Sequence, residues 1–277
     1  MFNLSNIYHP LTAKPFMNNE TYIEVQPCED LKPYICCFWG MPKPYSSITT
    51  TEMGYKLVIP DTCMDIIFSI NSNKNQLNDL FVGISDTTFK DNNASPTIAC
   101  FGIRFYSWAV PLFSDESMKY TLNTFAQGEA YFKNFKCDLQ EILISNSLIF
   151  DRVEKLEKYL IKRLDLNKQN NNVMNSIYKI LKSKGTASIS ELASYTAVSH
   201  RQLERLFLEY VGVSPKKLSQ LVRYQYLWQD ILLDINFNIH DSVCKYGYTD
   251  QSYLINDFKR YHTLSPINAR KFAYETR

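Results

Sequence analysis

Residues 189–215, ISELASYTAVSHRQLERLFLEYVGVSP, decide the fold of the C-terminal part of this 277-residue chain. They predict a helix, a tight turn and a second helix. Ser199 can cap the second helix, because its hydroxyl can accept a hydrogen bond from a free backbone N–H two or three residues on. Helix-spaced apolar side chains then form one stripe, made of Leu203, Leu206, Phe207 and Tyr210. Arg201, Gln202 and Arg205 lie off this stripe and share a solvent face, as a major-groove reader requires.

The same pattern recurs about fifty residues later. Its apolar and turn positions map with a constant offset of 51, which pairs Leu203, Phe207, Tyr210, Ser214 and Pro215 with Leu254, Phe258, Tyr261, Ser265 and Pro266. Asp250 stands where Ser199 stood and is an equally good cap. Between the copies, an amphipathic run from Pro215 to about Leu233 predicts a long helix, because proline is favoured in a first helical turn. Such a helix would hold two recognition helices about one DNA turn, roughly 34 Å, apart.

Four motifs in this part, SHRQLERLF, VGVSPKKL, GYTDQSYLINDFKR and LSPINAR, resemble the AraC family of bacterial transcription regulators. The resemblance spans about 189–273. It implies a sequence-specific regulator of transcription, an activator or a repressor, that binds double-stranded promoter or operator DNA. It also implies RNA polymerase as a further partner, and a cytoplasmic protein that joins the nucleoid when bound. By resemblance, the first recognition helix presents Arg201, Gln202, Glu204 and Arg205 to DNA, and the second presents Gln251, Ser252, Tyr253 and Asn256.

The second copy departs from the family pattern at several positions. Ser242 and Val243 stand where the family usually has a large aliphatic and a small residue, Thr263 replaces a glycine, and Ala269 replaces a tyrosine. Asn256 stands where many relatives carry arginine. We therefore expect the second module to pack less tightly and to read DNA less specifically. Glu204 in the first module has two interpretations, an acceptor for a cytosine amino group or a salt-bridge partner of a neighbouring arginine.

The first half predicts a β-rich domain, since short apolar runs alternate with turn residues. The expected strands are 35–39, 56–59, 65–70, 80–84 and 97–106, with strand or loop at 46–52 and a bulge at Gly102. Helices are expected at 139–144 and 151–164. FWG at 38–40, IPDTCMDIIF at 59–68 and FGIRF at 101–105 resemble the β-rich sensor half of some AraC-type regulators, although Thr62 replaces a usual glycine. The chain is thus predicted to be an α+β two-domain protein with a sensor at 1–165, a linker at 166–172 and an all-α double helix-turn-helix domain at 173–277.

An effector of unknown identity would bind the sensor half. Aromatic side chains supply apolar contact area and a lone charge fixes a polar group, so the candidates are Trp39, Asp65, Arg104 and Trp108. The alternative is that the tryptophans belong to the core and that Arg104 simply pairs with Asp65. Control by a protein partner, or by modification of the thiols of Cys36, Cys37 and Cys63, is a further alternative.

The segment 138–165 also has two interpretations. One is a homodimer interface in which Leu148, Ile149 and Phe150 meet a twofold mate, and the other is a lid packed on the sensor.

The sequence argues against several classes of protein, namely membrane proteins, metal-binding proteins and enzymes. The sequence contains no run of about 18 apolar residues, so we expect no transmembrane helix. The seven cysteines lack zinc-ligand spacing, and no Ser/His/Asp set or glycine-rich phosphate loop is visible, so we expect no metal, no cofactor and no enzyme. From Asn170 onward, 14 Lys/Arg stand against 9 Asp/Glu, while the chain as a whole carries only +2. A basic C-terminal half is consistent with contacts to phosphates.

Overall fold

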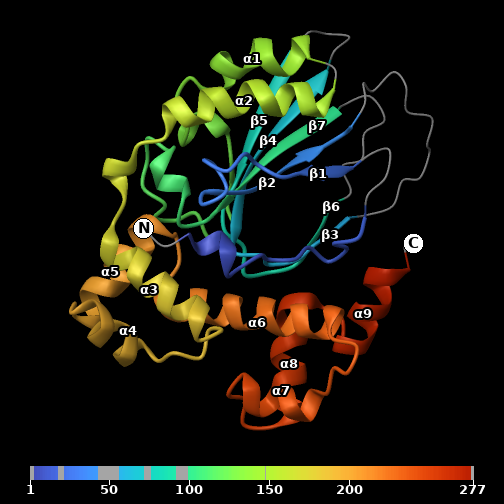
Figure 1. Cartoon of the computed structure of the whole chain (residues 1–277), viewed down its shortest axis with the longest axis vertical. Coiled ribbons are helices and arrows are strands. Elements are labelled where there is room, and N and C mark those ends of the chain that lie inside the picture. The colour runs from blue at the N-terminus through green and yellow to red at the C-terminus, as the bar shows by residue number, and fades with distance from the viewer. Residues whose placement is uncertain are drawn as a thin grey trace.

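The computed structural model describes residues 3–17, 22–42, 56–71, 76–91, 99–146 and 148–275. A β-rich part lies above a purely helical part (Figure 1), so the predicted α+β two-domain class is confirmed. No helix in these ranges combines the length and the apolar character needed to cross a membrane.

The β-rich part is built on an antiparallel sheet with the strand order β1-β2-β7-β4-β5-β8 within the described ranges. In that spatial order the strands are Ile23–Val25, Ile35–Gly40, Ala99–Tyr106, Cys63–Asn71, Gln76–Val82 and Phe125–Ala126. Beside it, β3 (Lys56–Val58) pairs with β6 (Phe89–Asp91). Four expected strands are found close to their predicted positions. The fifth, β5, begins at Gln76 rather than Leu80, because pairing with β4 recruits polar residues that show no β pattern of their own. The expectation for 46–52 lies outside the described residues.

Gly102 does not form the predicted bulge. It lies in regular register, opposite Ile67 on one side and Trp39 on the other, and the irregularity falls between Ile35 and Cys37 instead. The reason for glycine is the indole of Trp39, since a Cβ at position 102 would lie 2.1 Å from the Cε2 atom of Trp39. The glycine therefore marks a close side-chain approach rather than an interrupted ladder.

Two helices, α1 (Phe135–Ser145) and α2 (Ile149–Arg163), cover the sheet at the top of Figure 1. The Phe135 ring stacks on Phe68 of β4 with a centroid distance of 6.2 Å. In the second helix Val153, Leu156 and Leu160 are buried, and Leu164, which caps its C-terminus, is half-buried. Single 3-10 turns lie at Leu4–Asn6, Val110–Leu112, Gly128–Ala130 and Leu166–Lys168.

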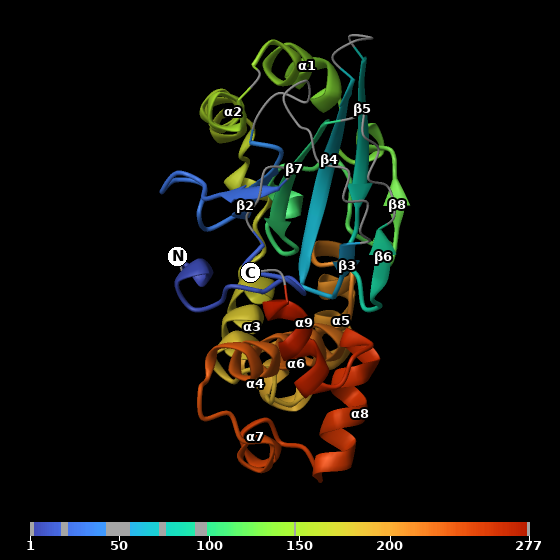
Figure 2. The same cartoon turned by 90° about the vertical axis from the view of Figure 1, so that its right-hand side faces the viewer.

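The helical part contains α3 (Asn171–Lys182), α4 (Ile189–Thr196), α5 (His200–Tyr210), α6 (Pro215–Leu233), α7 (Ile239–Lys245), α8 (Gln251–His262) and α9 (Pro266–Tyr274). The long helix α6 has the predicted bounds. Its N-cap is Ser214, whose hydroxyl accepts a hydrogen bond from the Lys217 amide at 3.2 Å. Figure 2 shows α5, α6, α8 and α9 gathered below the sheet. The predicted linker is short, because the 3-10 turn and the start of α3 occupy most of it.

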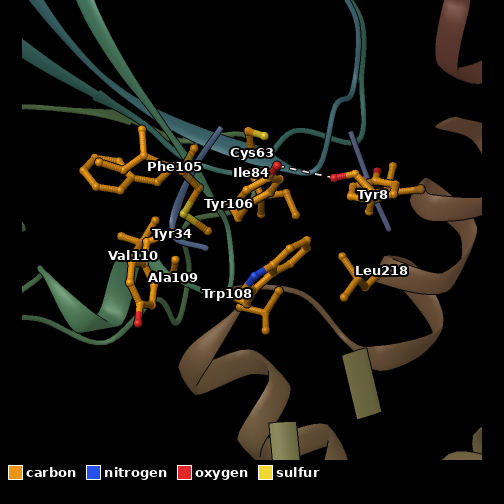
Figure 3. Close-up of a cluster of buried hydrophobic side chains, with 14 of the residues drawn as sticks. Tyr8, Tyr34, Cys63, Ile84, Phe105, Tyr106, Trp108, Ala109, Val110 and Leu218 are labelled. Atoms are coloured by element: carbon orange, nitrogen blue, oxygen red, sulfur yellow. Dashed lines mark hydrogen bonds between the residues drawn. The ribbon is translucent and has the colours of Figure 1, made fainter. Parts of the chain in front are cut away.

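The two parts are joined along α6 by the N-terminal arm, residues 3–17. The Gln225 amide is fully buried, accepts from the Leu11 amide at 2.8 Å and donates to the carbonyl of Pro60 at 2.6 Å. Trp228 donates its indole N–H to the Thr12 carbonyl at 3.1 Å. Figure 3 shows Tyr8, Tyr106 and Trp108 of the first part meeting Leu218 of α6 in one buried cluster. The two parts therefore share a continuous core.

Candidate nucleic-acid interface

The first helix-turn-helix unit, α4 with α5, is capped at both helix starts. Ser188 and Glu191 form a capping box on α4: the Ser188 hydroxyl accepts from the Glu191 amide at 3.2 Å, and the Glu191 carboxylate accepts from the Ser188 amide at 2.7 Å. Ser199 caps α5 by accepting from the Gln202 amide at 3.2 Å. Each such cap contributes about 1 kcal/mol to stability, because it satisfies a donor that the helix leaves free. The predicted N-cap is therefore present.

The outer face of α5 carries the four side chains predicted to meet DNA. Arg201, Gln202, Glu204 and Arg205 are all exposed, whereas Leu203, Leu206 and Phe207 are buried on the opposite side. Within the described part of the chain, Arg201, Glu204 and Arg205 form no ion pair with another side chain. The alternative of a salt bridge to Glu204 is thus not seen. Both guanidinium groups are free to meet phosphates or base edges.

The second unit, α7 with α8, is capped in the same way. The Asp250 carboxylate accepts from the Tyr253 amide at 2.8 Å at the start of α8. Ser252, Tyr253 and Asn256 are exposed, with 51% of Tyr253 accessible, and Gln251 is half-buried.

The apolar stripe of the second recognition helix is buried like that of the first. Leu254, Phe258 and Tyr261 are at most 1% exposed, whereas Val243 of α7, at one of the departures from the family pattern, is half-buried. Ala269 is also fully buried. Lower DNA specificity of this unit stays a prediction.

Two threonines that replace family glycines both have left-handed backbone conformations. Thr263 ends α8 with φ 67°, and Thr62 precedes β4 with φ 63°. A β-branched residue is strained there, whereas glycine is not. Thr62 offsets part of that cost because its hydroxyl bonds the Tyr8 hydroxyl at 2.9 Å in a buried setting. The Thr263 hydroxyl donates only to the adjacent carbonyl of His262.

The first domain holds the C-terminal ends of both recognition helices. The Met118 amide donates to the Glu209 carbonyl of α5 at 2.9 Å, and the Thr88 hydroxyl donates to the Tyr261 carbonyl of α8. Lys217 of α6 pairs with Asp86 at 2.6 Å. Burial alone would raise the pKa of Asp86, but hydrogen bonds from Lys217 and Asn123 hold it below its usual value. Any displacement of the first domain would thus act on both recognition helices.

Three of the four predicted effector residues lie together on the sheet. The Trp39 indole N–H donates to Asp65 at 2.7 Å, and the Arg104 guanidinium lies 3.3 Å from the same carboxylate. Arg104 also faces Asp61 at 3.6 Å and Glu24 at 3.7 Å. The Arg104–Asp65 pair considered as the alternative is therefore formed. Among the described residues, three carboxylates against one guanidinium leave an excess of negative charge, although burial raises the pKa of Asp61.

Trp108 lies apart from that group. It is 4% exposed and stacks on Tyr106 with a centroid distance of 4.9 Å, in the buried cluster of Figure 3. It therefore belongs to the core between the two parts, as the alternative to its effector role required.

Several residues that organise this interface carry no sequence signal of their own. Gln225 joins the domains, and Arg223, Tyr248 and Asp257 form a contact group beside α8. Helical spacing places Asp257 one turn after Tyr253, but it does not reveal the partner on α6.

Comparisons with known proteins divide the chain in the same way. Residues 192–271 match a helix-turn-helix domain family, and residues 23–127 match a domain family of unknown function (DUF6597). No curated protein matches the chain.

Among solved structures, an AraC-type transcriptional regulator from Chromobacterium violaceum is 20% identical, over 38% of this chain and 95% of that one, with a TM-score of 0.34. The C-terminal domain of AraT, a response regulator from Geobacillus stearothermophilus, is 24% identical over 37% and 85% of the chains, with a TM-score of 0.34. ToxT from Vibrio cholerae is 16% identical over 77% and 91%, with a TM-score of 0.41.

Proposed function

We propose that this chain, which carries an AraC-type helix-turn-helix domain behind a β-rich domain, is a sequence-specific DNA-binding regulator of transcription. The observation that carries the proposal is the pair of capped helices, α5 and α8, which have exposed polar faces and both contact α6. Arg223 in the middle of α6 pairs with Asp257 of α8, and α5 directly precedes α6, so one helix places both recognition helices. Two helices that enter one face of DNA in successive major grooves should lie roughly 34 Å apart.

The helices α5 and α8 would contribute differently to DNA binding. Arg201 and Arg205 give α5 two cations that can pair with guanine edges or with phosphates. The N-terminal half of α8 offers uncharged groups, Gln251, Ser252, Tyr253 and Asn256. We therefore infer that α5 supplies most of the electrostatic affinity and that α8 adds discrimination through placement of neutral side chains.

Contacts through residues 60–62 would connect an effector site on the sheet to helix α6 of the DNA-binding domain. Asp61 faces Arg104 at 3.6 Å, and the carbonyl of its neighbour Pro60 accepts from Gln225 of α6 at 2.6 Å. Thr62 bonds Tyr8, whose ring lies 5.5 Å from Tyr226. A ligand that displaced Arg104 from its carboxylates would disturb the 60–62 segment and, through it, the linker helix. The negative excess favours a small cationic or hydrogen-bond-donating effector.

Thiol modification is less well supported as the control mechanism. Cys37 and Cys63 are buried and Cys36 is half-buried, and burial raises the pKa of Cys63 to about 12. A reactive thiol needs an accessible sulfur and a lowered pKa.

A second copy of the chain is the partner that α2 would accept. Leu148, Phe150 and Ile161 are 43%, 61% and 42% exposed. Ile149 is fully buried in its own domain and would take no part. The alternative, a lid packed on the sensor, is supported by the buried Val153, Leu156 and Leu160 of α2 and by the stacking of Phe135 of α1 on the sheet.

The test is a genome-wide footprint of the intact protein, repeated with Arg205→Ala and Gln251→Ala separately. If the two changes erase distinct halves of one motif, both helices read adjacent major grooves. If only Arg205→Ala has an effect, the second module is a support. A wild-type protein that leaves no footprint, with or without extracts of its host cells as a source of effector, would refute the proposal.

A further inference from the structure

Three side chains from three elements meet beside the second recognition helix. Arg223 of α6 donates to the Asp257 carboxylate of α8 at 3.2 Å. The Tyr248 hydroxyl, from the turn between α7 and α8, donates to the same carboxylate oxygen at 2.9 Å. The Arg223 guanidinium also lies over the Tyr248 ring, 4.3 Å from its centroid. We call Arg223, Tyr248 and Asp257 the α8 anchor.

The anchor is sheltered from water, so its geometry is strongly determined. The side chains of Arg223 and Asp257 are 16% and 8% exposed, and Tyr248 is 7% exposed. A buried ion pair holds its place only if both charges keep their partners. The backbone of Arg223 is packed against Gly185, where a Cβ would lie 2.7 Å from the Arg223 amide nitrogen. The backbone of Arg223 is thus in close contact with the turn between α3 and α4.

The anchor touches one of the side chains predicted to read DNA. The Tyr248 ring meets Tyr253 edge to face, with a centroid distance of 5.8 Å and an interplanar angle of 63°. Tyr253 lies one helical turn before Asp257 on α8. The exposed Tyr253 ring is therefore supported from below by Tyr248, which is itself held by Asp257 and Arg223.

We propose that Arg223, Tyr248 and Asp257 are positioning residues that fix the rotation of α8 and the orientation of Tyr253 for base reading. This inference rests on the proposed DNA-binding function. The N-terminal half of α8 has no cation, so its discrimination depends on where neutral groups are held rather than on charge. An apolar or aromatic contact with a thymine methyl group is lost when the side chain moves. Holding Tyr253 in one rotamer before binding lowers the entropy cost of that contact.

The chain supplies a matched control two residues earlier in the same turn. Tyr246 is fully buried, and its hydroxyl donates to Asp230 of α6 at 2.6 Å. Tyr246→Phe and Tyr248→Phe therefore delete the same chemical group, each from a bond to an aspartate. Of the two phenylalanine variants, only Tyr248→Phe alters the anchor.

The experiment uses the intact protein and a duplex selected from random DNA by the wild type. Affinity is measured for that duplex and for a second duplex whose half-site facing α8 is scrambled. The ratio of the first affinity to the second reports how specifically α8 reads its half-site. We expect Tyr248→Phe to reduce the ratio about fivefold, the loss typical of one hydrogen bond. Asp257→Asn keeps an acceptor for Tyr248 but removes the charge facing Arg223, and should reduce the ratio further. Tyr246→Phe should lower the melting temperature while leaving the ratio unchanged.

A double variant separates positioning from general stability. If Tyr248 acts through Tyr253, Tyr248→Phe has no further effect on the ratio once Tyr253→Ala is present. An unchanged ratio in Tyr248→Phe, or an equal fall in Tyr246→Phe, would overturn the inference while leaving the DNA-binding function intact. A wild-type protein that selects no duplex overturns the proposed function and the inference together.

Discussion

The side-chain amide of Gln225 donates to the carbonyl of Pro60 at 2.6 Å, across a separation of 165 residues. This contact joins the middle of the linker helix to the segment that precedes β4. The same side chain also bonds both backbone groups of Leu11. One fully buried glutamine therefore holds together the arm, the sheet and the DNA-binding domain.

Gln225→Ala should lower the free energy of unfolding by about 3 kcal/mol. It leaves the part-buried N–H and carbonyl of Leu11 and the buried carbonyl of Pro60 unpaired. Such groups cost about 1–3 kcal/mol each before local relaxation. Urea unfolding of the intact protein measures the loss. Gln229→Ala is the matched control, because Gln229 makes one bond to the arm, to the His9 carbonyl, at an exposed position. Equal losses in the two variants would contradict the role of burial.

His262 should make the protein less stable in mild acid. Burial lowers its pKa to about 3, against about 6.5 in an unfolded chain. The unfolded state then binds a proton that the folded state excludes. The contribution is complete above pH 6.5 and is lost as the pH falls from there toward 3. At pH 5 the loss is about 2 kcal/mol.

The test compares unfolding free energies at pH 7.5 and pH 5 for the wild type and for His262→Asn. The Asn amide can still bond the Tyr224 hydroxyl, which lies 2.9 Å from Nδ1 of His262. We expect the variant to be less stable at both values but to lose about 2 kcal/mol less between them. Parallel pH profiles would show that His262 is not the titrating group.

Thr263→Gly should stabilise the protein by about 0.5–1 kcal/mol. The left-handed conformation at φ 67° costs a β-branched residue of order 1–3 kcal/mol, and the greater freedom of glycine in the unfolded chain offsets part of the gain. Thermal unfolding measures the change. Thr62→Gly relieves a similar strain but removes the bond to Tyr8, so it should give no gain. A lower melting temperature for Thr263→Gly would refute this account.

Arg205→Ala should weaken binding to the selected duplex by about 1–3 kcal/mol if Arg205 pairs with a base edge. The loss should then be smaller on a duplex altered at that base. If Arg205 meets a phosphate instead, binding weakens on all duplexes. The slope of log affinity against log salt concentration then falls in magnitude by about 1. Lys162→Ala, an exposed cation on α2, is the charge-matched control and should leave affinity unchanged. An unaltered dissociation constant for Arg205→Ala at fixed salt would exclude Arg205 from the interface.

Helix boundaries in the DNA-binding domain were predictable because their causes are local. Ser199 and Asp250 cap helices three residues away, and Pro215 begins α6 at the position where proline is tolerated best. The exposed face of α5 followed from helical periodicity, whereas the side chains expected on the face of α8 came from the resemblance to the AraC family. In the first domain, by contrast, β5 begins four residues before its apolar run, because a neighbouring strand supplies the hydrogen bonds.

Short-range spacing was enough to predict the duplicated helix-turn-helix, its caps, the outward face of α5 and the β-rich character of the first half. Three further features became visible only in the folded chain: the reason for glycine at position 102, the place of Trp108 in the core, and the pairing of Arg223 of α6 with Asp257 of α8. The physical reason is that these features depend on partners tens of residues or more away along the chain. Periodicity identifies which face of an element is buried, but packing alone selects the side chain that it meets.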